Sequence, residues 1–148
     1  MRALVQRVRE AEVEAEGRVT GRIGRGMLVF LAIAKGDTRR EADYLRDKLA
    51  GLRIFADEQG KMNLNLRQAG GAMLVVSQFT LYGDCTRGLR PSFDRAAAPE
   101  QARELYRYFI ESARAASLEV ESGVFQAHML VRIVNDGPVT VICDSLPR

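Results

Sequence analysis

The segment Ser77-Gln78-Phe79-Thr80-Leu81 places two hydroxyl groups and a carboxamide at the end of an apolar run. Two interpretations are open. The polar side chains can simply reach the edge of a buried strand. Alternatively, hydroxyls and backbone N–H groups at a strand end can face a carbonyl substrate, and such donors stabilise the oxyanion of an acyl-transfer transition state. The segment is therefore a candidate site for acyl-transfer chemistry.

A second segment, residues 135–140, reads Asn-Asp-Gly-Pro-Val-Thr. Asn, Asp and Gly favour tight turns, so a turn is the interpretation that the residues alone support best. A cis peptide bond between Gly137 and Pro138 is an open alternative, although only about 5–6% of X–Pro bonds in folded proteins are cis.

A third segment, residues 87–93, is a loop that contains Arg87 and Arg90 and is followed by Arg95. Arginines in a loop of this kind can be merely solvated. They also follow the candidate site directly, and guanidinium groups suit the phosphates of a nucleic acid. Both interpretations stay open on the sequence.

Other catalytic devices are missing from the sequence, which has no phosphate-binding loop, dinucleotide-binding motif, GxSxG elbow or HExxH motif. The single histidine, His128, excludes sites that need two imidazoles, and an edge position is favoured over a role as general base. Cys85 and Cys143 are expected to be free thiols rather than a disulfide. No motif requires a metal or a cofactor.

The composition is that of an ordinary globular domain. The 148 residues are 47% hydrophobic and 28% charged, which fits one domain over residues 1–148. The net charge of +3 is compatible with a polyanionic partner without proving one. The longest apolar run, residues 27–34, is too short to cross a membrane, and no signal peptide is visible, so we expect a cytoplasmic protein.

Hydrophobic periodicity predicts strands, then a helix, strands, a second helix and closing strands. The first helix is expected near residues 39–51, because Thr38 and Glu41 have capping-box spacing, and the second near 99–115, because Pro99 suits the first helical position. The expected strands cover residues 4–9, a hairpin of 12–16 and 18–23, and 27–34, 54–55, 72–81, 118–122, 125–134 and 139–143. The sequence thus predicts a single, sheet-rich α+β domain with two main helices.

Two of these segments together resemble the signature motifs of a known family. Residues 77–82 (Ser-Gln-Phe-Thr-Leu-Tyr) and 135–140 are similar, in order and separation, to the motifs of the D-aminoacyl-tRNA deacylase family, also called the D-tyrosyl-tRNA deacylase family. Supporting blocks lie at residues 1–8, 60–64 and 90–93, so the resemblance runs from end to end. The sequence departs from the family's pattern at Gly83, Cys85, Thr86, Gln126 and His128, which affects the details of tRNA contact.

The resemblance implies a homodimer that hydrolyses the ester between a D-amino acid and the 3′ end of tRNA, with aminoacyl-tRNA as its partner and no membrane. It implies that a cis Gly137–Pro138 unit enters the partner subunit's pocket, that Arg7 helps to hold this loop, and that Met129 lies beside the pocket. It also implies that the pocket is lined by four motif residues, namely Ser77, Gln78, Phe79 and Thr80. Such an enzyme would serve translation quality control by chiral proofreading, and glycyl-tRNA is an expected side substrate.

The hydrolytic step has two candidate routes. Thr80 could be a nucleophile, but a free threonine hydroxyl is a poor one and nothing nearby in the sequence supplies its base. We favour a route in which the N–H groups of Phe79 and Thr80 stabilise the oxyanion and the terminal ribose 2′-hydroxyl helps to activate water. A rival class is a non-catalytic nucleic-acid-binding module that uses Arg87, Arg90 and Arg95.

Overall fold

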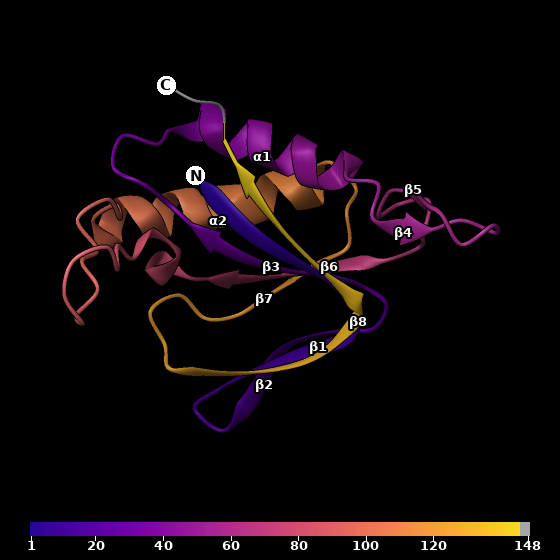
Figure 1. The fold of residues 1–148 in the computed structure, drawn as a ribbon, viewed down its shortest axis with the longest axis horizontal. Helices are drawn as coiled ribbons and strands as arrows, with labels where there is room; N and C mark the ends of the chain where they lie inside the picture. The colour runs from indigo at the N-terminus through magenta and orange to yellow at the C-terminus, as the bar shows by residue number, and fades with distance from the viewer. Residues whose placement is uncertain (146–148) are drawn as a thin grey trace.

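A computed structural model describes residues 1–145 of the chain. The elements, in chain order, are β1 (Arg2–Ala15), β2 (Arg18–Ile23), β3 (Gly26–Ala32), α1 (Arg39–Gly51), β4 (Phe55–Ala56), β5 (Met62–Leu64), β6 (Ala72–Ser77), a 3₁₀ helix (Phe79–Tyr82), α2 (Pro99–Ala115), β7 (Val120–Ser122) and β8 (Met129–Asp144). The expected α+β domain with two main helices is confirmed, and both helices lie on the same side of the sheet (Figure 1).

The main sheet has the order β2-β1-β3-β6-β7, with β8 also paired to β1. β1 is antiparallel to β2, β3 and β8, whereas β3, β6 and β7 run parallel to one another. The parallel strands bring the carboxyl end of β6, where the first motif begins, beside the end of β3.

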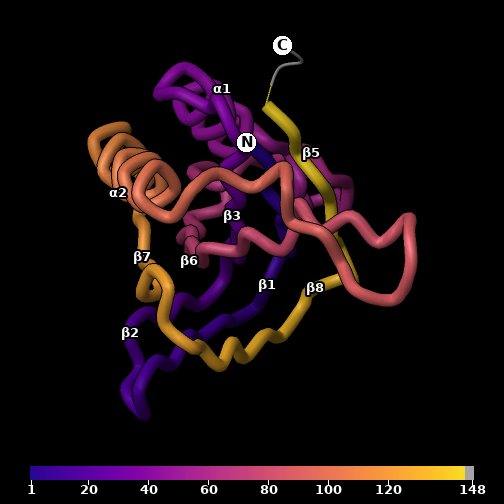
Figure 2. Tube along the Cα trace, turned by 90° about the vertical axis from the view of Figure 1, so that its left-hand side faces the viewer, coloured from indigo at the N-terminus to yellow at the C-terminus, as the bar shows by residue number. Residues whose placement is uncertain are grey.

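β1 bends, and the bend creates two hydrophobic clusters. Its first half pairs with β3 and its second half with β2, while β8 follows it along both halves. Figure 2 shows β1, β2 and β8 curving away beneath β3 and β6. One cluster fills the space between sheet and helices and includes Phe55 and Phe109. The other, which includes Val13 and Leu74, is enclosed by the curled strands.

Both helix starts follow from the sequence. Thr38 accepts from the N–H of Arg40, and the Glu41 carboxylate accepts from the N–H of Thr38, so the predicted capping box is present at α1. Pro99 occupies the first turn of α2, where its missing N–H leaves no unsatisfied donor. The predicted ranges 39–51 and 99–115 are both confirmed.

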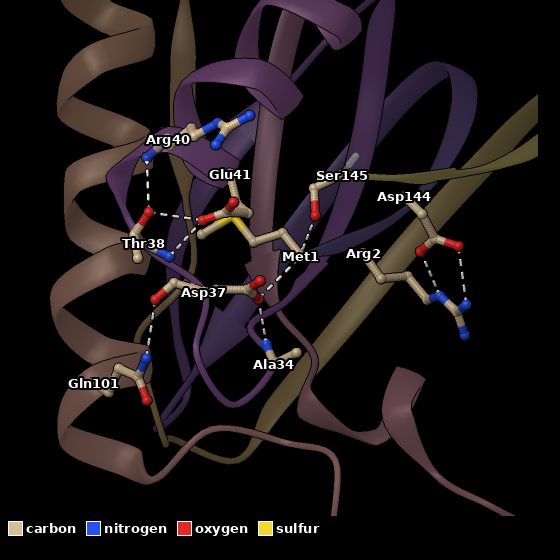
Figure 3. A network of polar contacts seen from close by, with 10 residues as sticks. All are labelled: Met1, Arg2, Ala34, Asp37, Thr38, Arg40, Glu41, Gln101, Asp144 and Ser145. Carbon is tan, nitrogen blue, oxygen red and sulfur yellow. Dashed lines mark hydrogen bonds and ion pairs between the residues drawn. The ribbon is translucent and has the colours of Figure 1, made fainter. Parts of the chain in front are cut away.

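A polar network fastens the start of the chain to both helical regions and to the end of β8 (Figure 3). The amino group of Met1 lies 2.8 Å from the carboxylate of Asp37, and both groups are buried. It also donates to the hydroxyl of Ser145, at 2.7 Å. The carboxamide of Gln101, on α2, donates to the backbone carbonyl of Asp37. These bonds fix the segment that leads into α1.

The structure corrects several strand predictions. The strand expected over residues 72–81 ends at Ser77, and the 3₁₀ helix Phe79–Tyr82 follows it. Its apolar letters do not distinguish a buried strand from a short helix. The strands expected at 54–55 and 118–122 are Phe55–Ala56 and Val120–Ser122, because pairing begins later than the apolar residues do.

The closing strands also differ from the prediction. Residues 125–128 form a turn, and the strands expected at 125–134 and 139–143 are one strand, β8, that continues through residues 135–138. The local residues favour a turn, but pairing with β1 resumes beyond them, which is a non-local effect. Among the described residues, no helix is long and apolar enough to span a membrane.

Candidate active site

The first motif lies where β6 ends and the 3₁₀ helix begins. The N–H of Gln78 donates to the carbonyl of Leu31 at 2.8 Å, and the N–H of Leu81 donates back to Gln78 at 3.2 Å. The N–H groups of Phe79 and Thr80 open the helix, and within the described chain neither has an acceptor. Two adjacent backbone donors are therefore available to a ligand.

A pocket of about 740 Å³ adjoins these donors. Strand ends, the loop before α2 and the turn before β8 all contribute to it. Its lining is largely apolar and consists of Leu31, Ile33, Val76, Ser77, Gln78, Phe79, Phe93, Ala96, Ala97, Pro99, Ala102, Phe125, Gln126, Ala127, His128, Met129 and Val131. A mostly apolar concavity with a few polar groups is typical of a small-molecule site.

Two aromatic rings meet at this pocket. Phe79 and Phe93 pack edge to face with ring centroids 5.1 Å apart, although Phe79 is 55% exposed. A Cβ atom at Gly83 would lie 3.1 Å from the ring of Phe93. The absence of a side chain at Gly83 thus lets the loop bring Phe93 against the motif.

Apart from the imidazole of His128, which is exposed, the polar groups of the pocket supply no base. Its lining, within the described part of the chain, contains no acidic side chain. The hydroxyl of Thr80 accepts a hydrogen bond from the carboxamide of Gln78. A carboxamide orients a hydroxyl but cannot take its proton, so the arrangement suits backbone stabilisation of an oxyanion better than activation of Thr80.

The second motif forms a four-residue bulge in β8. Gln6 pairs with Thr140 and Val8 with Asn135, so residues 136–139 face the single residue between Gln6 and Val8. The carboxamide of Asn135 donates to the carbonyl of Arg7 on β1, at 2.9 Å, and to the carbonyl of Val139 at the end of the bulge, at 3.1 Å. The bond between Gly137 and Pro138 is cis.

Arg7, the single residue of β1 that faces the bulge, binds it through its side chain. Its guanidinium donates to the carbonyl of Asp136 at 3.1 Å and to the carbonyl of Ile54 at 2.7 Å, and lies 3.5 Å from the Asp136 carboxylate. A Cβ atom at Gly137 would lie 2.9 Å from the guanidinium, and Gly137 has a φ of +131°. The residue must therefore be glycine for both backbone conformation and space.

The structure brings together only part of the predicted site. Ser77, Gln78, Phe79 and Met129 line one pocket, with Thr80 next to it. The bulge residues and Arg7 do not line this pocket within one chain.

The three loop arginines are exposed, but they do not have the same surroundings. Arg87 and Arg90 lie in the exposed loop before α2. Arg95 lies 5.5 Å from the ring centre of Tyr82, and Arg2 lies at the same distance. Burial raises the pKa of Tyr82 to about 12, although the two guanidinium groups act in the opposite direction. The phenol thus stays neutral and serves as a platform for the cations.

Sequence reasoning missed the aromatic lining of the pocket. Phe93 stands alone among polar loop residues and Phe125 lies beside a turn, and a lone aromatic in such a place is the signal that could have indicated a binding role. The strand expected over residues 125–134 does not include Phe125 and Gln126, which belong to a turn, and both line the pocket together with His128. His128 is exposed, as expected.

The cysteines are free thiols, as expected: Cys85 is exposed, whereas Cys143 is buried. Burial raises the pKa of the Cys143 thiol. No group of three or more His, Cys, Asp or Glu side chains suited to a metal ion occurs in residues 1–145.

Comparison with known proteins gives the class of this fold and site. A profile of the family described as D-Tyr-tRNA(Tyr) deacylase matches residues 4–144. The chain is 59% identical over 145 residues to the D-aminoacyl-tRNA deacylase of Symbiobacterium thermophilum, covering 98% of this chain and 96% of that one. It is 56% identical to the enzyme of the same name from Thermotoga petrophila, with 98% and 97% covered.

Solved structures show the same fold. The structure of a protein named c-Myc DNA Unwinding Element Binding Protein has a TM-score of 0.93 at 39% identity and covers 99% of this chain and 100% of its own. A probable eukaryotic D-amino acid tRNA deacylase has a TM-score of 0.77 at 18% identity, covering 97% of this chain and 98% of its own, and shows the fold alone. The protein is thus a hydrolase. It belongs to the D-Tyr-tRNA(Tyr) deacylase family.

Proposed function

We propose that this protein hydrolyses the ester bond between a D-amino acid and the 3′ end of tRNA, releasing free tRNA and the D-amino acid. The observation that carries the proposal is the pair of free N–H groups, on Phe79 and Thr80, beside a pocket of about 740 Å³ in a chain of this family. We place this activity in the cytoplasm, where it would remove D-amino acids from tRNA before translation uses them.

The two N–H groups are positioned to receive developing negative charge. When water attacks the ester carbon, the carbonyl oxygen becomes an oxyanion, and fixed donors stabilise it more than they stabilise the ester. The donors are fixed because the bonds of Gln78 and Leu81 hold the backbone on both sides. They need no reorganisation during the reaction.

Activation of water is assigned to the substrate. Thr80 contacts a carboxamide, and no acidic side chain lines the described pocket. The one imidazole in the lining, that of His128, is exposed and makes no hydrogen bond to Thr80, so the proposal does not rely on a side-chain base. The 2′-hydroxyl of the terminal ribose is adjacent to the ester and can orient and polarise the attacking water. The protein then contributes positioning and electrostatics.

Selection of the D-configuration is assigned to the bulge of a second copy. In this proposal, the backbone carbonyls of Gly137 and Pro138 enter the pocket of the partner subunit and accept hydrogen bonds from the substrate's α-ammonium group. With ammonium and ester both held, an L side chain would meet the packed wall, and a D side chain would point to solvent. The bonds from Arg7 and Asn135 support the role, since they hold the bulge in place, and Gly137 and Pro138 are exposed.

Two consequences for substrates follow. Because the D side chain points away from the protein, many different D-amino acids should be accepted. Glycine has no side chain to clash with the wall, so glycyl-tRNA, including glycine mischarged on tRNA(Ala), should be hydrolysed as well.

The homodimer that this mechanism needs has a suitable surface. Among the described strands β8 pairs with β1 alone, so its outer edge is open. Large apolar side chains are exposed along it, namely Leu130, Ile133, Val134 and Ile142. Exposed apolar surface of this kind is typical of interfaces. We assign contact with the phosphates of tRNA to Arg87, Arg90 and Arg95, which are exposed in the segment between the 3₁₀ helix and α2.

The decisive experiment compares the deacylation of D-tyrosyl-tRNA with that of L-tyrosyl-tRNA. Rapid release of D-tyrosine with the L-ester left intact is expected. Hydrolysis of both esters at equal rates would reject chiral selection, and hydrolysis of neither would reject the proposed function.

A second candidate is a nucleic-acid-binding module without catalysis. The 39%-identical protein of the same fold is named as a binding protein of a DNA unwinding element, and the three loop arginines also favour this candidate. The same experiment separates it, because that module would bind tRNA and release no amino acid.

A further inference from the structure

The segment between β7 and β8, residues 123–128, forms one wall of the pocket. Phe125, Gln126 and His128 line the cavity from this segment. Gln126 has a φ of +64°, a left-handed conformation that side chains other than glycine rarely adopt. A backbone of this kind persists only where its surroundings hold it.

The surroundings that hold Gln126 come from α2. Arg103 donates from its guanidinium to the carboxamide oxygen of Gln126 at 2.5 Å. The same guanidinium lies 5.4 Å from the ring centre of Phe125. Arg103 therefore contacts two successive residues of the wall, although it does not line the pocket itself.

The same face of α2 also connects this wall with β6. The ring of Tyr106 lies 5.7 Å from that of Phe125. Its buried hydroxyl donates to the carbonyl of Val75 at 2.8 Å, two residues before Ser77. The wall and the strand that leads to the first motif are thus both fastened to one rigid helix.

We propose that Arg103 is a positioning residue for deacylation, acting through Gln126 to fix the wall of the pocket. The inference rests on the proposed function. A charge-assisted bond to a carboxamide is stronger than a neutral one, so it can keep Gln126 in its unfavourable backbone conformation. Without it the turn relaxes, the pocket changes shape, and the aminoacyl end is held less accurately against the donors of Phe79 and Thr80.

The test is a pair of kinetic comparisons on D-tyrosyl-tRNA. Arg103→Ala is made in the natural sequence and in a Gln126→Gly background, where the bond is absent and the left-handed backbone is unstrained. In the natural sequence, we expect Arg103→Ala to lower kcat/KM about five-fold, mainly through kcat. In the Gln126→Gly background, we expect it to lower kcat/KM less than about two-fold relative to Gln126→Gly alone. Arg103→Lys, which keeps a charged donor, should recover part of the loss.

Arg107→Ala is the matched control, because Arg107 is exposed on the same helix and its ion pair with Glu111, at 3.7 Å, stays on that helix. Arg107→Ala should retain full activity. Arg103→Ala and Arg107→Ala should both unfold at nearly the same temperature as the unmodified protein. The salt dependence of kcat/KM should also be unchanged by Arg103→Ala, since the guanidinium contacts the protein and not a phosphate.

If the unmodified protein is active, three results would overturn the role alone. An equal loss in both backgrounds, with a weaker salt dependence, would show that Arg103 contacts the RNA directly. Unchanged activity would show an ordinary solvated arginine, and a loss explained by a lower unfolding temperature would show a purely structural one. An unmodified protein inactive on D-tyrosyl-tRNA would reject the proposed function and this role with it, whereas an active one unaffected by Arg103→Ala rejects the role alone.

Discussion

At the scale of single residues, the proposed chemistry belongs to the backbone more than to side chains. The donors that we propose for the oxyanion are the N–H groups of Phe79 and Thr80, and their positions depend on where β6 ends. A backbone donor survives replacement of its own side chain. The motif is therefore expected to tolerate changes that would inactivate an enzyme with a side-chain nucleophile.

Thr80→Ala gives the first prediction. If Thr80 orients groups without forming a covalent bond, kcat should fall only moderately, by about ten-fold, and binding of tRNA should not change. Single-turnover deacylation of D-tyrosyl-tRNA measures the effect. Thr80→Ser, which keeps the hydroxyl bonded to Gln78, is the matched control and should retain most of the activity.

A complete loss of turnover in Thr80→Ala with normal tRNA binding, together with a trapped acyl group on Thr80 of the unmodified enzyme, would reverse this assignment. Removing a hydroxyl from the substrate instead of the enzyme tests the other route. A D-tyrosyl-tRNA that lacks the terminal 2′-hydroxyl should react slowly, and an unchanged rate would reject the RNA-assisted route.

The ion pair between Arg2 and Asp144 gives a prediction about pH. Two hydrogen bonds of 2.7 and 3.0 Å from the Arg2 guanidinium lower the pKa of the Asp144 carboxyl. The folded protein thus releases this proton more readily than the unfolded chain, in which an aspartate has a pKa of about 3.9. The stabilisation is complete above that value and is lost as the pH falls through the lower pKa of the folded state.

Asp144→Asn should therefore lower the free energy of unfolding at pH 7 by only about 0.5 kcal/mol, since the pair is partly exposed. The difference from the unmodified protein should shrink below about pH 4 and vanish near pH 2. Urea unfolding at a series of pH values measures it. A difference that is as large at pH 2 as at pH 7 would mean that the carboxylate charge is not its source.

At the scale of elements, the two helices could be predicted to the residue, because their signals are local. Thr38 and Glu41 mark the start of α1 within four residues, and Pro99 marks the start of α2. The end of β6 and the course of β8 could not be predicted. Residues 78–81 alternate polar and apolar side chains, a pattern that also suits a strand, although a 3₁₀ helix forms there. Residues 135–138 have the composition of a turn, but pairing with the distant β1 makes them part of β8.

The bulge in β8 is held by an element 129 residues away, and this gives a prediction for Arg7. Arg7→Ala removes the guanidinium that donates hydrogen bonds to the backbone carbonyls of Asp136 and Ile54. We expect kcat/KM for D-tyrosyl-tRNA to fall about ten-fold and the ratio of D- to L-hydrolysis to fall with it, because the carbonyls of Gly137 and Pro138 lose their fixed position. Deacylation of both esters measures these effects.

Arg9→Ala is the matched control for that experiment. The Arg9 guanidinium lies 3.7 Å from the other oxygen of the Asp136 carboxylate, but its side chain is 78% exposed and it bonds neither carbonyl. It should leave the D-to-L ratio unchanged. Equal effects of the two substitutions would mean that charge near Asp136 matters and that the carbonyl bonds do not.

At the scale of the whole molecule, one chain holds both motifs but does not bring them together. Ser77–Phe79 line the pocket, whereas the bulge at residues 136–139 lies on the edge strand, outside that lining. The sequence indicated both motifs by resemblance, yet spacing along a chain cannot show whether two segments meet within one copy or between two. A monomer is thus expected to have a pocket without its chiral selector.

Val134→Asp tests that expectation. Val134 is 45% exposed on β8, close to the bulge and next to the open edge, so a buried carboxylate there would oppose association of two copies. The variant should sediment as a monomer, and its stereoselective deacylation should fall at least about ten-fold and recover as the protein concentration is raised. Val19→Asp, at a residue that is 49% exposed on β2, is the control and should leave mass and activity unchanged. A monomeric variant with full D-selective activity would show that each chain selects its substrate alone, and the bulge would need another role.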